Sequence, residues 1–124
     1  MKFLFVVCFL GSLSSAAQTT VNIANTLNEC QVHVTLYVKA DSVPCATTAP
    51  FTMIGLGVGM MDTVIIPLEF DLVKARIEDG AGGFITEIQF SGSPCATGLP
   101  LSDDFECGDG IGTASFMGTN ILIN

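Results

Sequence analysis

The chain has 124 residues, of which 49% are apolar and 13% are charged, and its twelve acidic and four basic residues give a formal net charge of −8. A disordered chain combines high net charge with low hydrophobicity, and a nucleic-acid-binding domain carries a basic patch. This sequence has neither combination. The composition therefore indicates one folded, acidic domain and argues against both of those classes.

Residues 1–17 have the organisation of a secretory signal peptide. Lys2 precedes an apolar run over residues 3–10, and a stretch of small residues leads to Ala17. The run is shorter than the roughly 20 residues that a membrane-spanning helix needs. We expect cleavage after Ala17, which leaves a secreted domain of residues 18–124 in the extracellular space or the periplasm. That domain has twelve acidic residues against three basic ones, a net charge of −9.

A second apolar stretch, residues 53–70, does not predict a membrane span either. Asp62 near its centre costs about 2.5–3.5 kcal/mol on the membrane-insertion scale, and Glu69 adds a second charge. Pro67 and three glycines weaken a helix there. We expect a glycine-rich loop followed by a buried strand, and no membrane span in the mature chain.

Alternating apolar residues predict short β-strands along the mature chain. The strongest pattern lies in residues 31–39, where Val32, Val34, Leu36 and Val38 alternate with other residues as in a half-buried strand. Further strands are predicted at residues 20–23, 63–69, 70–77, 84–90 and 113–124, the last with a break at Gly118.

Turn-forming residues separate these segments. Residues 40–50 and 91–112 are predicted to be loops, and the Asp79-Gly80 step predicts a hairpin between the strands on either side. No amphipathic helical pattern of useful length occurs. The sequence therefore predicts the all-β class, as a small antiparallel, Ig-like β-sandwich.

Four cysteines remain after signal cleavage: Cys30, Cys45, Cys95 and Cys107. An even number in a small exported chain predicts two disulfides, and four cysteines allow three pairings. We favour Cys30 with Cys45 and Cys95 with Cys107, because these pairs close short loops. A zinc site is the alternative, but the sequence has no C-x-x-C pair and only one histidine.

Catalytic arrangements are poorly represented, so no enzyme activity is predicted. His33 is the only candidate base of the usual kind, and its place in the alternating strand directs it to the polar face. Ser91 and Ser115 lack the glycines of a nucleophile elbow. Tyr37 beside His33 is the only obvious aromatic platform for a sugar.

Glycines at positions 55, 57 and 59 do not have the spacing of a phosphate-binding loop, and no Lys-Ser or Lys-Thr pair follows them. We interpret the segment as a flexible apolar turn. Five apolar residues in and around it would form an adhesive surface if they are exposed. They are Met53, Leu56, Val58, Met60 and Met61.

An acidic run gathers four carboxylates in the predicted loop before residue 110. They are Asp103, Asp104, Glu106 and Asp109. Calcium takes six to eight oxygen ligands from such loops, and extracellular modules bind it weakly. The spacing is not that of an EF-hand, so we weigh a weak calcium site against a solvated loop. The acidic second half of the chain is also where a cationic partner is expected.

Residues 20–25 and 29–37 resemble the start of small secreted bacterial β-sandwich proteins of uncharacterised function. In those proteins a first strand leads through an Asn-containing turn and a cysteine into a V-x-V-x-L strand, as Asn25, Cys30 and residues 32–36 do here. Thaumatin-like proteins begin in a similar way but are much longer and denser in disulfides. The resemblance implies an exported β-sandwich and assigns no activity and no site residue.

These observations predict a secreted, non-catalytic binding or surface-interaction protein whose ligand is unknown. The alternative is a structural or matrix component that self-associates through edge strands, such as residues 119–123. A small enzyme or an enzyme inhibitor is the third class considered. No cofactor other than calcium is expected.

Overall fold

The computed structural model describes residues 18–95 and 97–124, so the predicted signal peptide at residues 1–17 lies outside the described residues. The described part is all-β, as predicted. A short 3-10 helix, η1 (Cys45–Thr47), accompanies nine strands. The strands are β1 (Thr19–Asn25), β2 (Val32–Ala40), β3 (Ala49–Leu56), β4 (Met61–Ile66), β5 (Phe70–Asp79), β6 (Phe84–Gln89), β7 (Ser102–Cys107), β8 (Gly110–Met117) and β9 (Asn120–Ile123).

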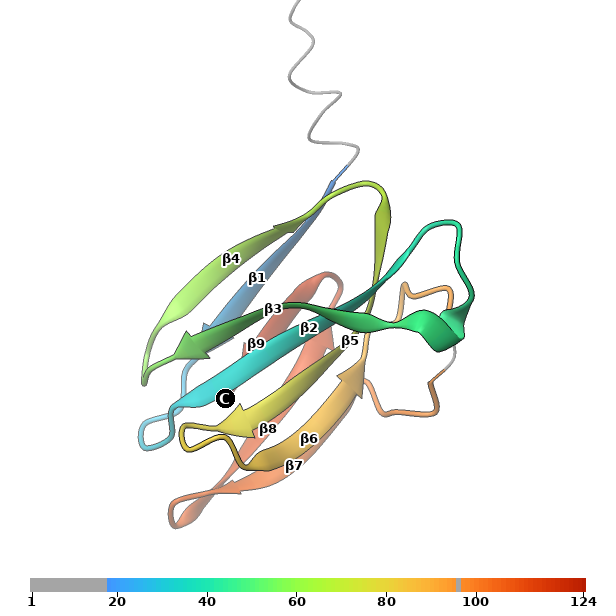
Figure 1. Cartoon of the computed structure of the whole chain (residues 1–124). Helices are drawn as coiled ribbons and strands as arrows, with labels where there is room; N and C mark the ends of the chain where they lie inside the picture. The colour runs from blue at the N-terminus through green and yellow to red at the C-terminus, as the bar shows by residue number, and fades with distance from the viewer. Residues whose placement is uncertain (1–17, 96) are drawn as a thin grey trace, which may run out of the picture.

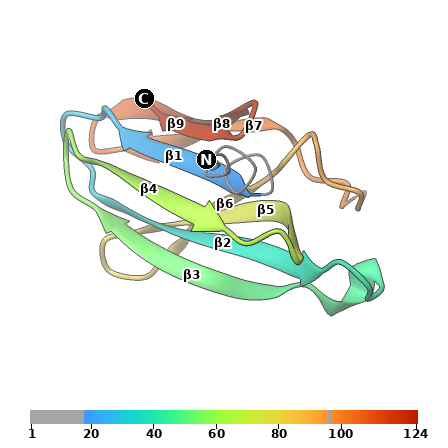
Figure 2. The ribbon, with the colours of Figure 1, turned by 90° about the horizontal axis from the view of Figure 1, so that it is seen from above.

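The strands form two sheets that pack face to face as a β-sandwich. One sheet has the order β4-β1-β9-β8-β7 and the other the order β3-β2-β5-β6. Figure 2 shows the two layers, with β1, β9, β8 and β7 above β5, β2 and β3. Neighbouring strands are antiparallel except β1 and β9, which run parallel. The fold class is therefore confirmed, with one parallel pair in a sandwich expected to be antiparallel.

Branched aliphatic side chains between the sheets make the core. In β2, Val32, Val34 and Leu36 are fully buried, which confirms the alternation seen in the sequence. β1 contributes Val21 and Ile23 from the facing sheet. The polar side of β2 is more buried than alternation predicts, because Thr35 is only 8% exposed and Lys39 only 7%.

The predicted hairpin is present. β5 and β6 pair antiparallel on either side of the Asp79-Gly80 step. The side chain of Asp79 accepts hydrogen bonds from the backbone N–H groups of Ala81 and Gly83, at 2.9 and 2.8 Å, and so stabilises the turn. Phe84 is 57% exposed, and the prediction that it faces the core side of its strand is wrong. A register shift at Ile77/Glu78 accompanies this change.

Two strands lie where loops were expected, and one strand is less buried than expected. β3 occupies residues 49–56 despite Pro50, and β7 lies within the predicted loop 91–112. Both are edge strands, where proline and charged residues are tolerated because one row of backbone groups faces solvent. β4 begins and ends earlier than predicted and is mostly exposed, whereas a buried strand was expected. The segment 113–124 divides at Gly118, whose φ of 65° suits a glycine at the β8–β9 turn.

Two disulfides are present, but the favoured pairing is wrong. Cys30 pairs with Cys107, and Cys45 pairs with Cys95. The chain crosses between the sheets several times, so cysteines far apart in sequence meet once the sandwich has closed. Each disulfide joins loops or strand ends from different hairpins: the β1–β2 loop to the end of β7, and η1 to the β6–β7 loop.

Candidate functional site

The sandwich has two lateral sides that differ sharply. On one side the edge strands are β3 and β4, joined by the turn 57–60, and on the other they are β6 and β7. Figure 1 shows β3 and β4 together at one margin of the molecule and β6 and β7 at the other. We call these the β3–β4 side and the β6–β7 side.

Exposed apolar side chains line the β3–β4 side. Four of the five residues suspected from the sequence are about half exposed or more, whereas Leu56 is buried. Ile65 on β4 adds a further exposed residue that the sequence reasoning missed. We define the methionine rim as Met53 (59% exposed), Val58 (49%), Met60 (55%), Met61 (69%) and Ile65 (53%). Three half-buried side chains behind it, Phe51, Ile54 and Val64, pack on the core.

A buried asparagine fixes the turn that carries the rim. Asn25, fully buried at the end of β1, donates from Nδ2 to the carbonyl oxygens of Cys30, Leu56 and Gly57 at 2.9, 3.2 and 3.3 Å. Its backbone N–H donates to the carbonyl of Met60 at 2.9 Å. One side chain therefore ties the β1–β2 loop to the β3–β4 turn. Gly59, with a φ of 74°, completes the turn.

The three basic residues of the described chain lie on the four-stranded sheet, and each is engaged by a carboxylate. Lys39 Nζ lies 3.2 Å from Asp71, and Lys74 Nζ lies 3.2 Å from Glu87. Arg76 Nε donates to Glu78 at 3.0 Å. These cations are therefore satisfied within the chain.

Tyr37, considered as a sugar platform, is not an open aromatic surface. The ammonium group of Lys74 lies 4.9 Å from the centre of its ring. Its strand neighbour His33 lines a hollow on the β3–β4 side instead. Nothing in the described arrangement places a nucleophile beside His33, because all four cysteines of residues 18–124 are in disulfides.

The acidic run lies on the β6–β7 side, on an edge strand and its turn rather than in a loop. Its carboxylates do not converge. Thr86 Oγ1 donates to Asp103 at 2.6 Å, toward the other sheet, and Thr113 Oγ1 donates to Asp104 at 2.7 Å. Glu106 and Asp109 are exposed. Among residues 18–95 and 97–124 no group of three or more histidine, cysteine, aspartate or glutamate side chains is placed to hold a metal ion. Calcium binding at these positions stays an untested prediction.

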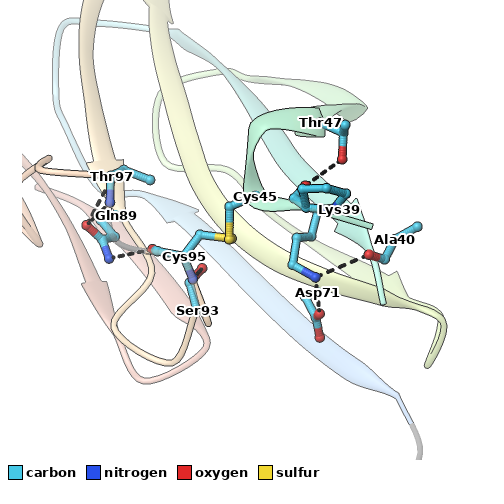
Figure 3. The surroundings of a disulfide bond; sticks show 10 residues. Lys39, Ala40, Cys45, Thr47, Asp71, Gln89, Ser93, Cys95 and Thr97 are labelled. Carbon is cyan, nitrogen blue, oxygen red and sulfur yellow. Dashed lines mark hydrogen bonds and ion pairs between the residues drawn. A yellow bond between two sulfur atoms is a disulfide. The ribbon is translucent and has the colours of Figure 1, made fainter. Parts of the chain in front are cut away.

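Contacts between the sheets are denser on the β6–β7 side. The rings of Phe90 and Phe116 lie 5.6 Å apart. Near the Cys45–Cys95 disulfide, Gln89 donates to the carbonyl of Cys95 at 3.1 Å and accepts from the Thr97 hydroxyl at 2.7 Å. Figure 3 shows this clamp on one side of the disulfide and the buried Lys39–Asp71 ion pair on the other.

Comparisons with known proteins give no relative for this chain. No helix in the described residues is long and apolar enough to cross a membrane. No family model matches the sequence, and no significant match was found among curated proteins or solved structures. The assignment of function therefore depends on the surface of the sandwich itself.

Proposed function

We propose that the chain is an exported, non-catalytic binding protein that engages an extended, uncharged segment of a partner protein along its β3–β4 side. The observation that carries this proposal is the methionine rim, in which five large apolar side chains are each about half exposed or more. Single exposed apolar residues are ordinary, whereas a group of them marks an interaction surface. Methionine side chains adapt to partners of varied shape.

The charge of the edge strands supports the same side. β4, β6 and β7 each contain at least one acidic residue, whereas β3 contains none. Charged residues on an edge strand discourage pairing with another chain. β3 is therefore the edge that is open to addition of a strand, in which backbone hydrogen bonds give affinity and alternate side chains give specificity.

A bound strand beside β3 would also cover incompletely buried core residues. Phe51, Ile54 and Val64 are each partly exposed although they pack on the core. The net charge of −9 for residues 18–124 disfavours an acidic partner. We therefore expect an uncharged or basic segment with alternating apolar residues, which accommodates the expectation of a cationic partner.

A panel of labelled eight-residue peptides tests this proposal by fluorescence anisotropy. The peptides alternate valine with threonine, lysine or glutamate. We expect the threonine and lysine peptides to bind and the glutamate peptide to fail. Met53→Lys should weaken binding at least tenfold, whereas the matched control Met117→Lys, at the end of β8, should change it less than twofold. Absence of binding across the panel, or equal effects of the two variants, would contradict the proposal.

Self-association through the same edge is the alternative, as in a structural component. Size-exclusion chromatography with light scattering over a hundredfold range of concentration separates the two. A monomer at all concentrations supports a binding protein. Growth with concentration that Met53→Lys abolishes supports the structural alternative.

Export is part of the proposal and has its own test. Two disulfides are consistent with an oxidising compartment. The full chain expressed in a bacterial host should be recovered outside the cytoplasm as residues 18–124, with an intact mass four hydrogens below that of the reduced form. Retention of residues 1–17, or free thiols after export, would contradict this part.

A further inference from the structure

The hollow beside His33 brings together the soft metal-binding groups that remain in the described chain. It has a volume of about 340 Å³, and Gln31, His33, Gly55, Gly57 and Met60 are among the residues that line it. Since the four described cysteines are in disulfides, the remaining soft donors are the thioethers of four methionines and one imidazole. The imidazole and one of these thioethers line this single hollow.

A third donor lies within reach on the same face. His33 of β2 is directly opposite Gly55 of β3, and Thr35 is opposite Met53. Met53 is therefore the diagonal neighbour of His33, and diagonal neighbours on one face have Cα atoms about 7–8 Å apart, which long side chains span. Met53 is 59% exposed and free to turn toward the ring.

Two glycines keep the space between these donors open. A Cβ atom at Gly55 would lie 3.3 Å from Cδ2 and 3.4 Å from Nε2 of His33. A Cβ atom at Gly57 would lie 3.0 Å from the sulfur of Met60. Any larger residue at either position would press on the donor group itself.

The imidazole is also uncommitted within the described residues. None of them forms a hydrogen bond or an ion pair with the His33 ring in this structure. Glu78, which faces His33 across β5, is held by Arg76 at 3.0 Å. The ring nitrogens are therefore available to a ligand that enters the hollow.

We propose that His33, Met60 and Met53 form a binding site for one monovalent copper ion. Thioether ligands select Cu(I), and imidazole is a good copper ligand, whereas zinc and calcium prefer thiolate, imidazole or oxygen donors that this hollow does not assemble. The site is distinct from the strand-binding edge of β3, because its donors are side-chain atoms on the outer face of the four-stranded sheet.

Competition with a chromophoric Cu(I) chelator tests the site. Residues 18–124 with both disulfides intact are titrated anaerobically with Cu(I) kept reduced by ascorbate. We expect one Cu(I) per chain, at least tenfold weaker binding in His33→Gln and in Met60→Leu, and no change in the control Met117→Leu. Zn²⁺ should bind at least a hundredfold more weakly than Cu(I).

Two further readouts distinguish a built site from loss of fold. Gly55→Val leaves every donor in place but fills the hollow, and it should weaken Cu(I) binding at least tenfold while the far-ultraviolet circular dichroism stays that of the parent. X-ray absorption of the loaded protein should show sulfur as well as nitrogen scatterers. Absence of Cu(I) binding, equal binding by Met60→Leu and the parent, or a copper shell without sulfur would overturn the proposal.

Discussion

The two lateral sides of the sandwich cover their edge strands in opposite ways. On the β6–β7 side, carboxylates guard the edges, a threonine hydroxyl bonds across the sheets to Asp103, and the Phe90–Phe116 contact closes the core. On the β3–β4 side, β3 has no charged residue and the methionine rim faces solvent. The first arrangement stabilises the fold and prevents pairing. The second contributes little to stability and is available for binding.

The disulfides set the largest stability effect, because they join elements of both sides. In the chain-entropy model, a bridge across 77 residues contributes about 4.5 kcal/mol and one across 50 residues about 4 kcal/mol. We expect the Cys45→Ala/Cys95→Ala variant to lose about 4 kcal/mol in urea unfolding, and the Cys30→Ala/Cys107→Ala variant slightly more. A loss below about 1 kcal/mol in both would show that the sheets hold without them.

Asn25 gives the next largest effect, on the turn that carries the rim. Asn25→Ala removes three donated hydrogen bonds and leaves buried carbonyl groups without a partner, so we expect about 2–4 kcal/mol of destabilisation. The matched control is Asn22→Ala on the same strand, whose hydrogen bonds to Asn120 and Thr63 are exposed. Thermal unfolding should place the control within 1 kcal/mol of the parent; equal losses would remove Asn25 from its special role.

Thr86 tests the closed side. It is only 5% exposed, and its hydroxyl donates to Asp103 at 2.6 Å. Thr86→Val keeps the shape and removes the hydrogen bond, so we expect a loss of about 1–2 kcal/mol in chemical unfolding. A neutral result would show that the contact across the β6–β7 side contributes nothing.

The rim itself should give the smallest effect on stability. Met61 is 69% exposed on β4, so Met61→Lys should change the free energy of unfolding by less than about 0.5 kcal/mol. The same change should weaken binding of the uncharged peptide. If Met61→Lys destabilised the protein as much as Thr86→Val, the contrast between a stabilising side and a binding side would not hold.

Part of this arrangement follows from local sequence pattern. Val32, Val34 and Leu36 repeat at a period of two within one strand, and Asp79-Gly80 specifies a tight turn, so β2 and the β5–β6 hairpin are predictable. The disulfide pairing is not, because it depends on which loops meet after the sheets have stacked. Proximity in sequence favoured Cys30 with Cys45, whereas the topology brings Cys30 to Cys107.

The edge strands were hidden by the residues that protect them. Asp103, Asp104 and Glu106 gave β7 the composition of a loop, and Pro50 with Gly55 did the same for β3. Edge strands tolerate such residues because their outer backbone groups face water. The candidate site was foreseen in its methionines, but its position beside His33 depends on the register of β2 with β3, which local pattern does not determine.

Selective ¹³C-methyl labelling of methionine tests the central claim most directly, because residues 18–124 contain four methionines and three belong to the rim. On titration with the valine-threonine peptide, the methyl signals of Met53, Met60 and Met61 should shift and saturate together, while that of Met117 stays in place. Shifts at Met117 alone, or equal shifts at all four methyl groups, would contradict a binding surface on the β3–β4 side.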